Sequence, residues 1–274
     1  MSLSGAFSFI IGMCVGSFLN VCIYRLPREI SIIKPFSFCP ECKISLKWYD
    51  NIPILSYFLL RGKCRNCHKK ITLRYPLVEF ITGCLFFFLY NRFSLSLDFF
   101  KFVFFFSLLI VVSFVDIDYH AIPVYFCFLG ILVGLFFAFY ESVIIYKQGF
   151  IDNLPIIVAF KGLIFGLGFT YFFKLMGDII LNIYLSLRKK DSIEGERESL
   201  GLGDVDFMGM VGIFLGIKLT VTVFFIAPFI ALFYSIFAII FKKSHLIPYL
   251  PYLSLAAFIS FIWGRNIITF VGLG

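Results

Sequence analysis

The chain has 274 residues, of which 61% are hydrophobic, 20% are aromatic and only 15% are charged. A soluble domain is about half apolar and about a quarter charged, so this composition excludes an ordinary soluble protein and indicates a polytopic membrane protein. The net charge of +8 does not indicate nucleic-acid binding, because 11 of the 24 Lys and Arg residues lie between Arg25 and Tyr75, as is typical of a cytoplasmic loop.

The apolar segments predict an all-α fold with about eight transmembrane helices, since a helix needs about 20 apolar residues to cross a bilayer. The first apolar run has no basic residue before it, and Arg25 and Arg28 follow it. A signal peptide carries its positive charge first, so we expect a retained helix with the N-terminus outside. The eight expected spans are 5–24, 76–91, 99–115, 124–140, 154–173, 205–220, 221–241 and 248–270.

Threading the chain from an outside N-terminus places the basic loops in the cytoplasm, in agreement with the positive-inside rule. The loops expected inside are 25–75, 116–123, 174–204 and 242–247. We therefore expect three parts: a first helix at 1–24, a cytoplasmic four-cysteine loop at 25–75, and a transmembrane domain at 76–274. Glycines four residues apart, Gly12 with Gly16 and Gly162 with Gly166, are expected to let helices pack closely.

Four of the eight cysteines form two C-x-x-C pairs in the basic loop, "CPEC" and "CRNC". Each such turn points two thiolates at one tetrahedral ion, and two turns complete the shell. A cytoplasmic loop does not favour disulfides, so we expect a structural Zn²⁺ bound by Cys39, Cys42, Cys64 and Cys67. The alternative is four reduced, unligated cysteines. His68 is expected to be a surface residue, because four sulfurs already close the shell.

Two stretches place acids at expected membrane edges on the cytoplasmic face. Asp116 and Asp118 lie in "FVDIDYHAIP", and Asp204 and Asp206 lie in "SLGLGDVDFMGMVG". A carboxylate at a bilayer edge is costly and marks function by default. Two carboxylates that share a proton can activate a water and protonate a leaving group, which is the chemistry of aspartic peptide hydrolysis. The alternative is that all four acids are solvated residues that cap the starts of helices.

A further acid follows a lysine at helical spacing. Lys174 precedes Asp178 by four residues, which predicts an ion pair on a helix surface.

The order of these motifs resembles the bacterial type IV prepilin peptidases, the leader peptidases of the GxGD aspartic class, over nearly the whole chain. The segments that carry the resemblance are "GSFLNVCIYRLPR" (16–28), "CPEC" (39–42), "WYDNIPILSYFLLRGKCRNC" (48–67), "ITLRYPLVEFITG" (71–83), "VDIDYHAIP" (115–123), "GLGD" (201–204) and "IPYLPYLSLAAF" (247–258). The resemblance implies that Asp116 and Asp204 are the catalytic pair, in preference to Asp118 and Asp206.

The resemblance also implies a function. Such enzymes cleave the basic leader of prepilins and pseudopilins after a Gly, at the cytoplasmic surface of the inner membrane. Many then methylate the new N-terminal residue with S-adenosyl-L-methionine, and the four-cysteine loop is associated with that second activity. The implied partners are prepilin-like precursor proteins and the lipid bilayer.

Three positions depart from the family pattern. Glu29 and Ile30 stand where Gly-Glu is usual, Asp206 replaces a usual Lys, and Val124 replaces a usual Asp or Asn. The first departure leaves open a peptidase that has lost methyl transfer. A non-enzymatic membrane scaffold or transporter with a zinc-stapled loop is the other alternative.

Overall fold

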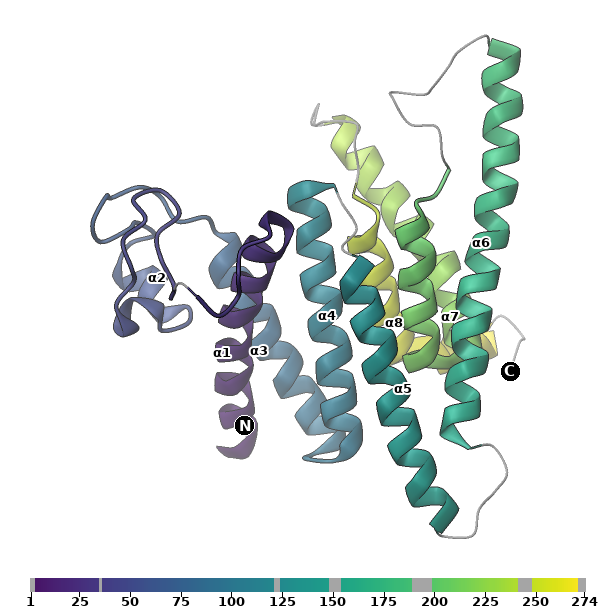
Figure 1. Ribbon diagram of the computed structural model, residues 1–274, viewed down its shortest axis with the longest axis horizontal. Coiled ribbons are helices and arrows are strands. Elements are labelled where there is room, and N and C mark those ends of the chain that lie inside the picture. The colour runs from purple at the N-terminus through teal and green to yellow at the C-terminus, as the bar shows by residue number, and fades with distance from the viewer. Residues whose placement is uncertain are drawn as a thin grey trace. The chain divides into compact units, whose positions relative to one another are not determined.

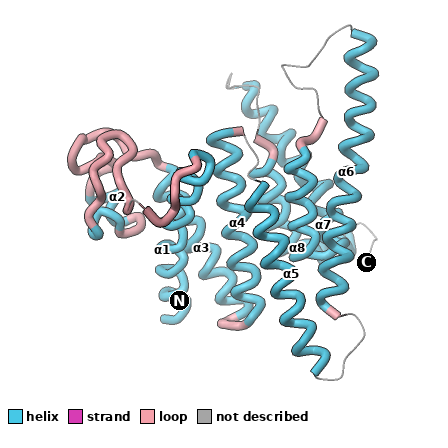
Figure 2. The backbone as a smooth tube through the Cα atoms, viewed as in Figure 1, coloured by secondary structure: helices cyan, strands magenta, loops and turns pink. Residues whose placement is uncertain are grey.

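The computed structural model describes residues 3–34, 36–120, 124–147, 154–188, 199–240 and 248–270, and these residues form helices and loops without a β-strand (Figure 2). Two isolated β-bridges, Phe38 with Ser45 and Lys63 with Lys70, lie in the four-cysteine loop. The predicted all-α fold is therefore confirmed for the described part of the chain. The chain divides into two compact units, Met1–His120 and Ala121–Gly274.

The first unit places helices before and after the four-cysteine loop. Its elements are α1 (Leu3–Arg25), η1 (Leu26–Arg28), η2 (Trp48–Asn51), α2 (Leu55–Leu59), α3 (Arg74–Phe93) and α4 (Leu97–Tyr119). α1 packs along α3, and α4 contacts both helices (Figure 1). A Cβ on Gly12 would lie 2.7 Å from the Cβ of Phe86, and one on Gly16 would lie 2.7 Å from the Cα of Glu79. The predicted packing role of this glycine pair is confirmed.

The second unit is a helical bundle. Its elements are α5 (Val124–Lys147), α6 (Pro155–Arg188), α7 (Leu202–Ile240) and α8 (Leu250–Phe270). α7 contacts the other three helices. Gly162 and Gly166 of α6 lie directly against the backbone of Gly212 and Met208 in α7, with no room for a Cβ. This second glycine pair therefore also packs two helices closely, as predicted.

The two expected spans 205–220 and 221–241 lie in α7, which is broken at Gly216. The backbone there has φ 75° and ψ 173°, a conformation that glycine adopts without the steric cost that other residues carry. The break therefore lies before the expected boundary at 220–221. Hydropathy alone could not find it, because the residues on both sides of Gly216 are apolar.

α6 extends well beyond its expected end at 173, so the predicted loop 174–204 is wrong over residues 174–188. A helix of 34 residues is about 50 Å long, against about 30 Å for the hydrocarbon core of a bilayer. Lys174 and Asp178, the charged residues just after the expected end, pair with one another within the helix. The rest of that loop lies largely outside the described residues, as do residues 121–123 and 241–247.

Five elements among the described residues are long and apolar enough to cross a membrane. They are Leu3–Arg28, Leu97–Tyr119, Val124–Lys147, Pro155–Arg188 and Leu202–Ile236. Leu250–Gly264 in α8 is a shorter apolar helix. These lengths agree with a multi-pass membrane protein, whereas the number of eight spans stays a prediction.

Candidate functional site

The four cysteines of the loop converge on one point. The sulfur atoms of Cys39, Cys42, Cys64 and Cys67 all lie within 4.8 Å of one another. The sulfurs of Cys39 and Cys67 are 3.8 Å apart. A tetrahedral ion with Zn–S bonds of about 2.3 Å holds its sulfurs about 3.8 Å apart. The cluster therefore fits a four-coordinate zinc ion in both residue type and spacing.

Two identical backbone turns build this cluster. The N–H of Lys43 donates to the carbonyl of Cys39 at 2.9 Å, and the N–H of His68 donates to the carbonyl of Cys64 at 3.0 Å. The N–H groups of Cys39 and Cys64 each donate to the carbonyl five residues ahead. Lys43 and His68 have positive φ angles of 60° and 55°. His68 thus completes a turn with its backbone while its side chain is exposed, which confirms the prediction of a surface residue.

The electrostatics of the cluster also suit a cation. The N–H groups of Cys67 and Asn66 lower the pKa of the Cys64 thiol to about 7, which favours the thiolate that binds metal. At Cys67 the N–H of Lys69 lowers the pKa, but burial and the other three cysteines raise it more, to about 11. Four sulfurs this close cannot all ionise easily by themselves, so a bound dication would complete the site.

Buried charged side chains connect the four-cysteine loop to the helices of the first unit. Glu79 in α3 is 8% exposed, and its Oε2 accepts the N–H of Ile54 at 2.7 Å. Arg25 at the end of α1 is 3% exposed and donates to the carbonyls of Ser31 at 2.9 Å and Phe36 at 3.2 Å. The sequence analysis missed both residues, although a lone charge within or at the edge of an apolar run is the signal that could have found them.

Asp116 lies in the last turn of α4 and is 5% exposed. Its carbonyl accepts the N–H of His120, which ends the helix with φ 49°. A carboxylate at the end of a helix caps no free N–H groups, and the helix dipole there disfavours negative charge. The alternative that Asp116 caps the start of a helix is therefore wrong for this residue.

Asp118 is also in the last turn of α4, but it has a different role. It forms an ion pair with Arg74, the first residue of α3. Next to it, the guanidinium of Arg28 donates to the hydroxyl of Tyr119. Two arginines from the borders of the four-cysteine loop thus contact the end of α4 beside Asp116, so Asp118 is bound in a structural contact.

Asp204 lies in the first turn of α7 and is 5% exposed. Its Oδ2 accepts the N–H of Gly201 at 3.1 Å, and its own N–H donates to the carbonyl of Gly201 at 3.2 Å. Asp204 at the third helical position thus caps the N–H of Gly201 with its side chain, which is one half of a capping box, so the capping alternative holds for Asp204 in its local geometry. A capping aspartate is normally solvated, whereas this one is buried.

Tyr249, immediately before α8, belongs to the surroundings of Asp204. The side chain of Tyr249 is half-buried, and it interacts electrostatically with Asp204. The sequence analysis did not single out Tyr249, because a Tyr at a helix border is a common interfacial residue in membrane proteins.

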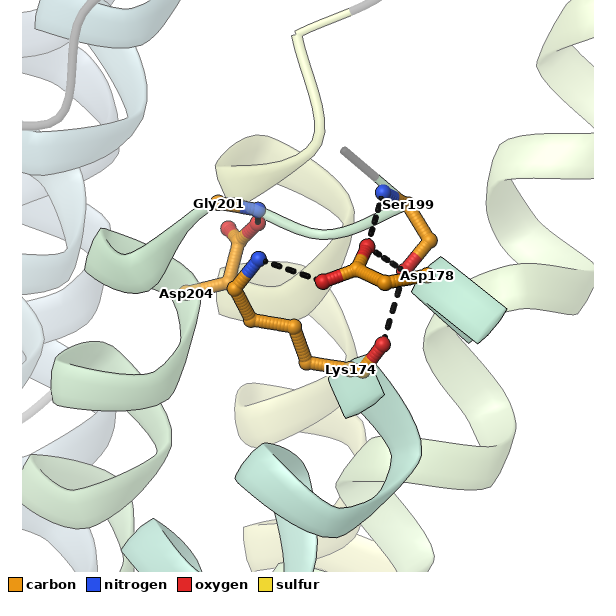
Figure 3. A network of polar contacts seen from close by, with 5 residues as sticks. All are labelled: Lys174, Asp178, Ser199, Gly201 and Asp204. Atoms are coloured by element: carbon orange, nitrogen blue, oxygen red, sulfur yellow. Dashed lines mark hydrogen bonds and ion pairs between the residues drawn. The ribbon is translucent and has the colours of Figure 1, made fainter. Parts of the chain in front are cut away.

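A polar network joins the second half of α6 to the segment that precedes Asp204 (Figure 3). The ammonium of Lys174 is 2.9 Å from Oδ2 of Asp178, and Oδ1 of Asp178 accepts the N–H of Ser199 at 2.7 Å. The predicted ion pair is confirmed, but its predicted place on the helix surface is wrong, since Lys174 is only 6% exposed. The segment 199–201, folded against α6, covers it.

The structure brings the four cysteines together within the first unit. Asp116 belongs to this first unit, Met1–His120, whereas Asp204 belongs to the second unit, Ala121–Gly274. Asp206, two residues after Asp204, is half-buried. The pairing of Asp116 with Asp204 therefore stays a prediction.

Comparisons with known proteins assign both parts of the chain. Residues 10–93 match the Bacterial Peptidase A24 N-terminal domain, and residues 103–236 match the Type IV leader peptidase family. A protein of Bacillus subtilis (strain 168) named "Prepilin leader peptidase/N-methyltransferase" is 30% identical over 96% of this chain and 95% of its own length. No solved structure matches the chain significantly.

Two further relatives carry the same name. One from Myxococcus xanthus (strain DK1622) is 36% identical over 78% of this chain, and the match spans 56% of that protein. One from Neisseria gonorrhoeae is 29% identical over 86% of this chain and 82% of its own length.

Proposed function

Because the chain belongs to the type IV leader peptidase family, we propose that it is an aspartic endopeptidase that removes the basic leader of type IV prepilins or pseudopilins. The observation that carries this proposal is a carboxylate buried at the end of a long apolar helix in each unit. Asp116 and Asp204 are each 5% exposed, although a buried carboxylate is costly to hold away from water. Such a cost is retained where the group has a function.

In this proposal Asp116 and Asp204 act together on one water. One carboxylate takes a proton from the water, which attacks the carbonyl carbon of the scissile bond. The other, protonated, carboxyl donates a proton to the departing amine. The pair titrates as a unit, so neither residue is assigned a fixed role.

The membrane-edge position of both aspartates fits the substrate class. A prepilin is a hydrophobic helix with a charged leader, and the bond between helix and leader lies at the membrane surface. We place both aspartates on the cytoplasmic side of the inner membrane, because the basic loop at 25–75 favours that side.

We further propose that Cys39, Cys42, Cys64 and Cys67 hold a structural Zn²⁺, which supplies a crosslink between the two turns when bound. The first unit would also support N-methylation of the cleaved product with S-adenosyl-L-methionine as the methyl donor.

A peptidase without methyl transfer is the second candidate, and it rests on the departure from the family pattern at Glu29. Glu29 has a φ of 57°, a left-handed conformation that suits the Gly usual in the family and costs another residue about 1 kcal/mol. The departure from Gly therefore changes the local backbone energetics as well as the charge at the border of the loop.

The test is cleavage of a prepilin by membranes that contain the wild type, Asp116→Asn or Asp204→Asn. Asp98→Asn is the matched control, since Asp98 lies in the first turn of α4, at the other end from Asp116, and pairs with Lys101. We expect both site variants to lose cleavage at unchanged protein levels and the control to keep it. Cleavage by either site variant at the wild-type rate would refute the assignment of that aspartate. Mass analysis of the mature N-terminus decides between the two candidates, because only methyl transfer adds a methyl group.

A further inference from the structure

The segment that leads into Asp204 is held by α6. Asp178 is the centre of the contact: its Oδ1 accepts the N–H of Ser199 at 2.7 Å and lies 2.8 Å from the Ser199 hydroxyl. The same hydroxyl is 3.1 Å from the carbonyl of Lys174, and it donates its one proton to either acceptor. Ser199 is thus bound to α6 through both its backbone and its side chain (Figure 3).

The fit of Ser199 against α6 is close. A Cβ on Gly177 would lie 2.5 Å from the Ser199 Oγ, so only glycine leaves room for this serine. Lys174 forms an ion pair with Asp178 beside this contact. The side chain of Lys174 is 7% exposed and that of Asp178 is 22% exposed. Because a buried ion pair contributes little net stability, its presence here requires another reason.

The anchored serine is two residues before Gly201, whose N–H donates to Oδ2 of Asp204 at 3.1 Å. Gly201, the last residue before α7, has no Cβ to restrict its backbone, so the short segment before the helix has a wide choice of conformations. A fixed point at Ser199 restricts where the N–H of Gly201 can lie. The orientation of the Asp204 carboxylate therefore depends on a contact made on another helix.

We propose that Lys174, Asp178 and Ser199 form a positioning clamp that fixes residues 199–203 on α6 and so orients the Asp204 carboxylate for hydrolysis. The proposal rests on the proposed function of Asp204. The role of each residue is positional. Lys174 pairs with Asp178 and holds it in place, Asp178 accepts from Ser199, and Ser199 transmits the position to Gly201.

Two double variants separate this role from simple charge neutralisation. Lys174→Met with Asp178→Leu removes both charges and the acceptor for Ser199. Lys174→Met with Asp178→Asn removes both charges but keeps a carbonyl oxygen that can accept from Ser199. Replacing a buried ion pair by neutral residues of similar volume is often tolerated, so both variants can fold.

We expect the Leu double variant to lose about 10- to 100-fold in kcat for prepilin cleavage, with KM unchanged, because displacements of about 1 Å at a reacting group have costs of that size. The Asn double variant should recover most of this loss. Equal kcat for the two double variants would overturn the proposal, whether both are active or both inactive. Should the Leu variant not accumulate, Ser199→Ala serves instead, with a several-fold loss of kcat expected and an unchanged kcat refuting the clamp.

Ser142→Ala is the matched control for Ser199→Ala. Ser142 is a buried serine of the same unit whose Oγ accepts the N–H of Ile156 at 2.8 Å, at the other end of α6. It should change thermal stability without changing kcat. Asp204→Asn is assayed in parallel: if that variant cleaves, the function of Asp204 is refuted, whereas if it is inactive and the Leu double variant is fully active, only the clamp is refuted.

Discussion

Removal of one zinc ligand should open the four-cysteine loop to proteolysis. In Cys64→Ser the buried thiol of the second turn is lost, and three sulfurs no longer close the shell. The metal links Cys39 and Cys64, which are 25 positions apart in the sequence. A crosslink of that span restricts the unfolded loop by about 3.5 kcal/mol in the chain-entropy estimate. Loss of the link should therefore raise the open population of the loop by about 10²- to 10³-fold.

The assay is limited trypsinolysis of the protein in membranes, followed by mass spectrometry of fragments from residues 25–75, where 11 Lys and Arg residues are available for cleavage. When the loop opens and closes rapidly, its cleavage rate follows the open population, so the rate should rise by about the same factor. Zinc content by elemental analysis should fall from one ion per chain. Cys84→Ser is the matched control, because Cys84 is an exposed cysteine of α3 outside the cluster. A purified wild type without zinc, or an unchanged cleavage rate after verified loss of zinc, would refute the reasoning.

Three further outcomes are expected. Asp118→Asn should keep prepilin cleavage but lose about 1–3 kcal/mol of stability in thermal unfolding, because it leaves the partly buried Arg74 without its charged partner. Asp116→Asn should instead lose cleavage and keep its stability. Glu79→Gln should loosen the loop at Ile54, seen as faster amide exchange of residues 52–60 with cleavage activity retained, and unchanged exchange would contradict the role of Glu79. Gly162→Leu should prevent accumulation of the protein while Gly168→Leu is tolerated, because a Cβ at 162 meets the backbone of Gly212 and one at 168 meets nothing within 4 Å.

Much of the helical framework could be predicted from apolar run length, because the bilayer imposes one length scale on every span. Apolar run length did not predict features that the thickness of the bilayer does not determine. α6 continues to Arg188, because Lys174 and Asp178 interrupt the apolar run without interrupting the helix. The break at Gly216 was missed because a backbone dihedral leaves no mark in a hydropathy profile.

The candidate sites also include residues that the sequence could predict and residues that it could not. The cysteine cluster could be predicted because C-x-x-C spacing is a local geometric constraint that does not depend on the rest of the fold. Asp118 could not be separated from Asp116 by spacing, since its partner Arg74 is far away in the sequence. The contact of Asp178 with Ser199 joins α6 to the segment before α7 across 20 intervening residues, and no periodic pattern indicates such a pair.

The repeated turns explain which part of the cluster depends on metal. Both turns have the same backbone hydrogen bonds and the same left-handed residue, at Lys43 and at His68, and these contacts exist within each turn alone. The contact between the turns is made by sulfur atoms, of which the pair Cys39 and Cys67 is 3.8 Å apart. A dication would therefore determine how the turns are joined, while the backbone determines the shape of each. Loss of zinc should therefore separate the two turns, while each turn keeps a local preference for its conformation. The loop between Arg25 and Arg74 would lose its internal link, but its two ends would stay attached to the helices.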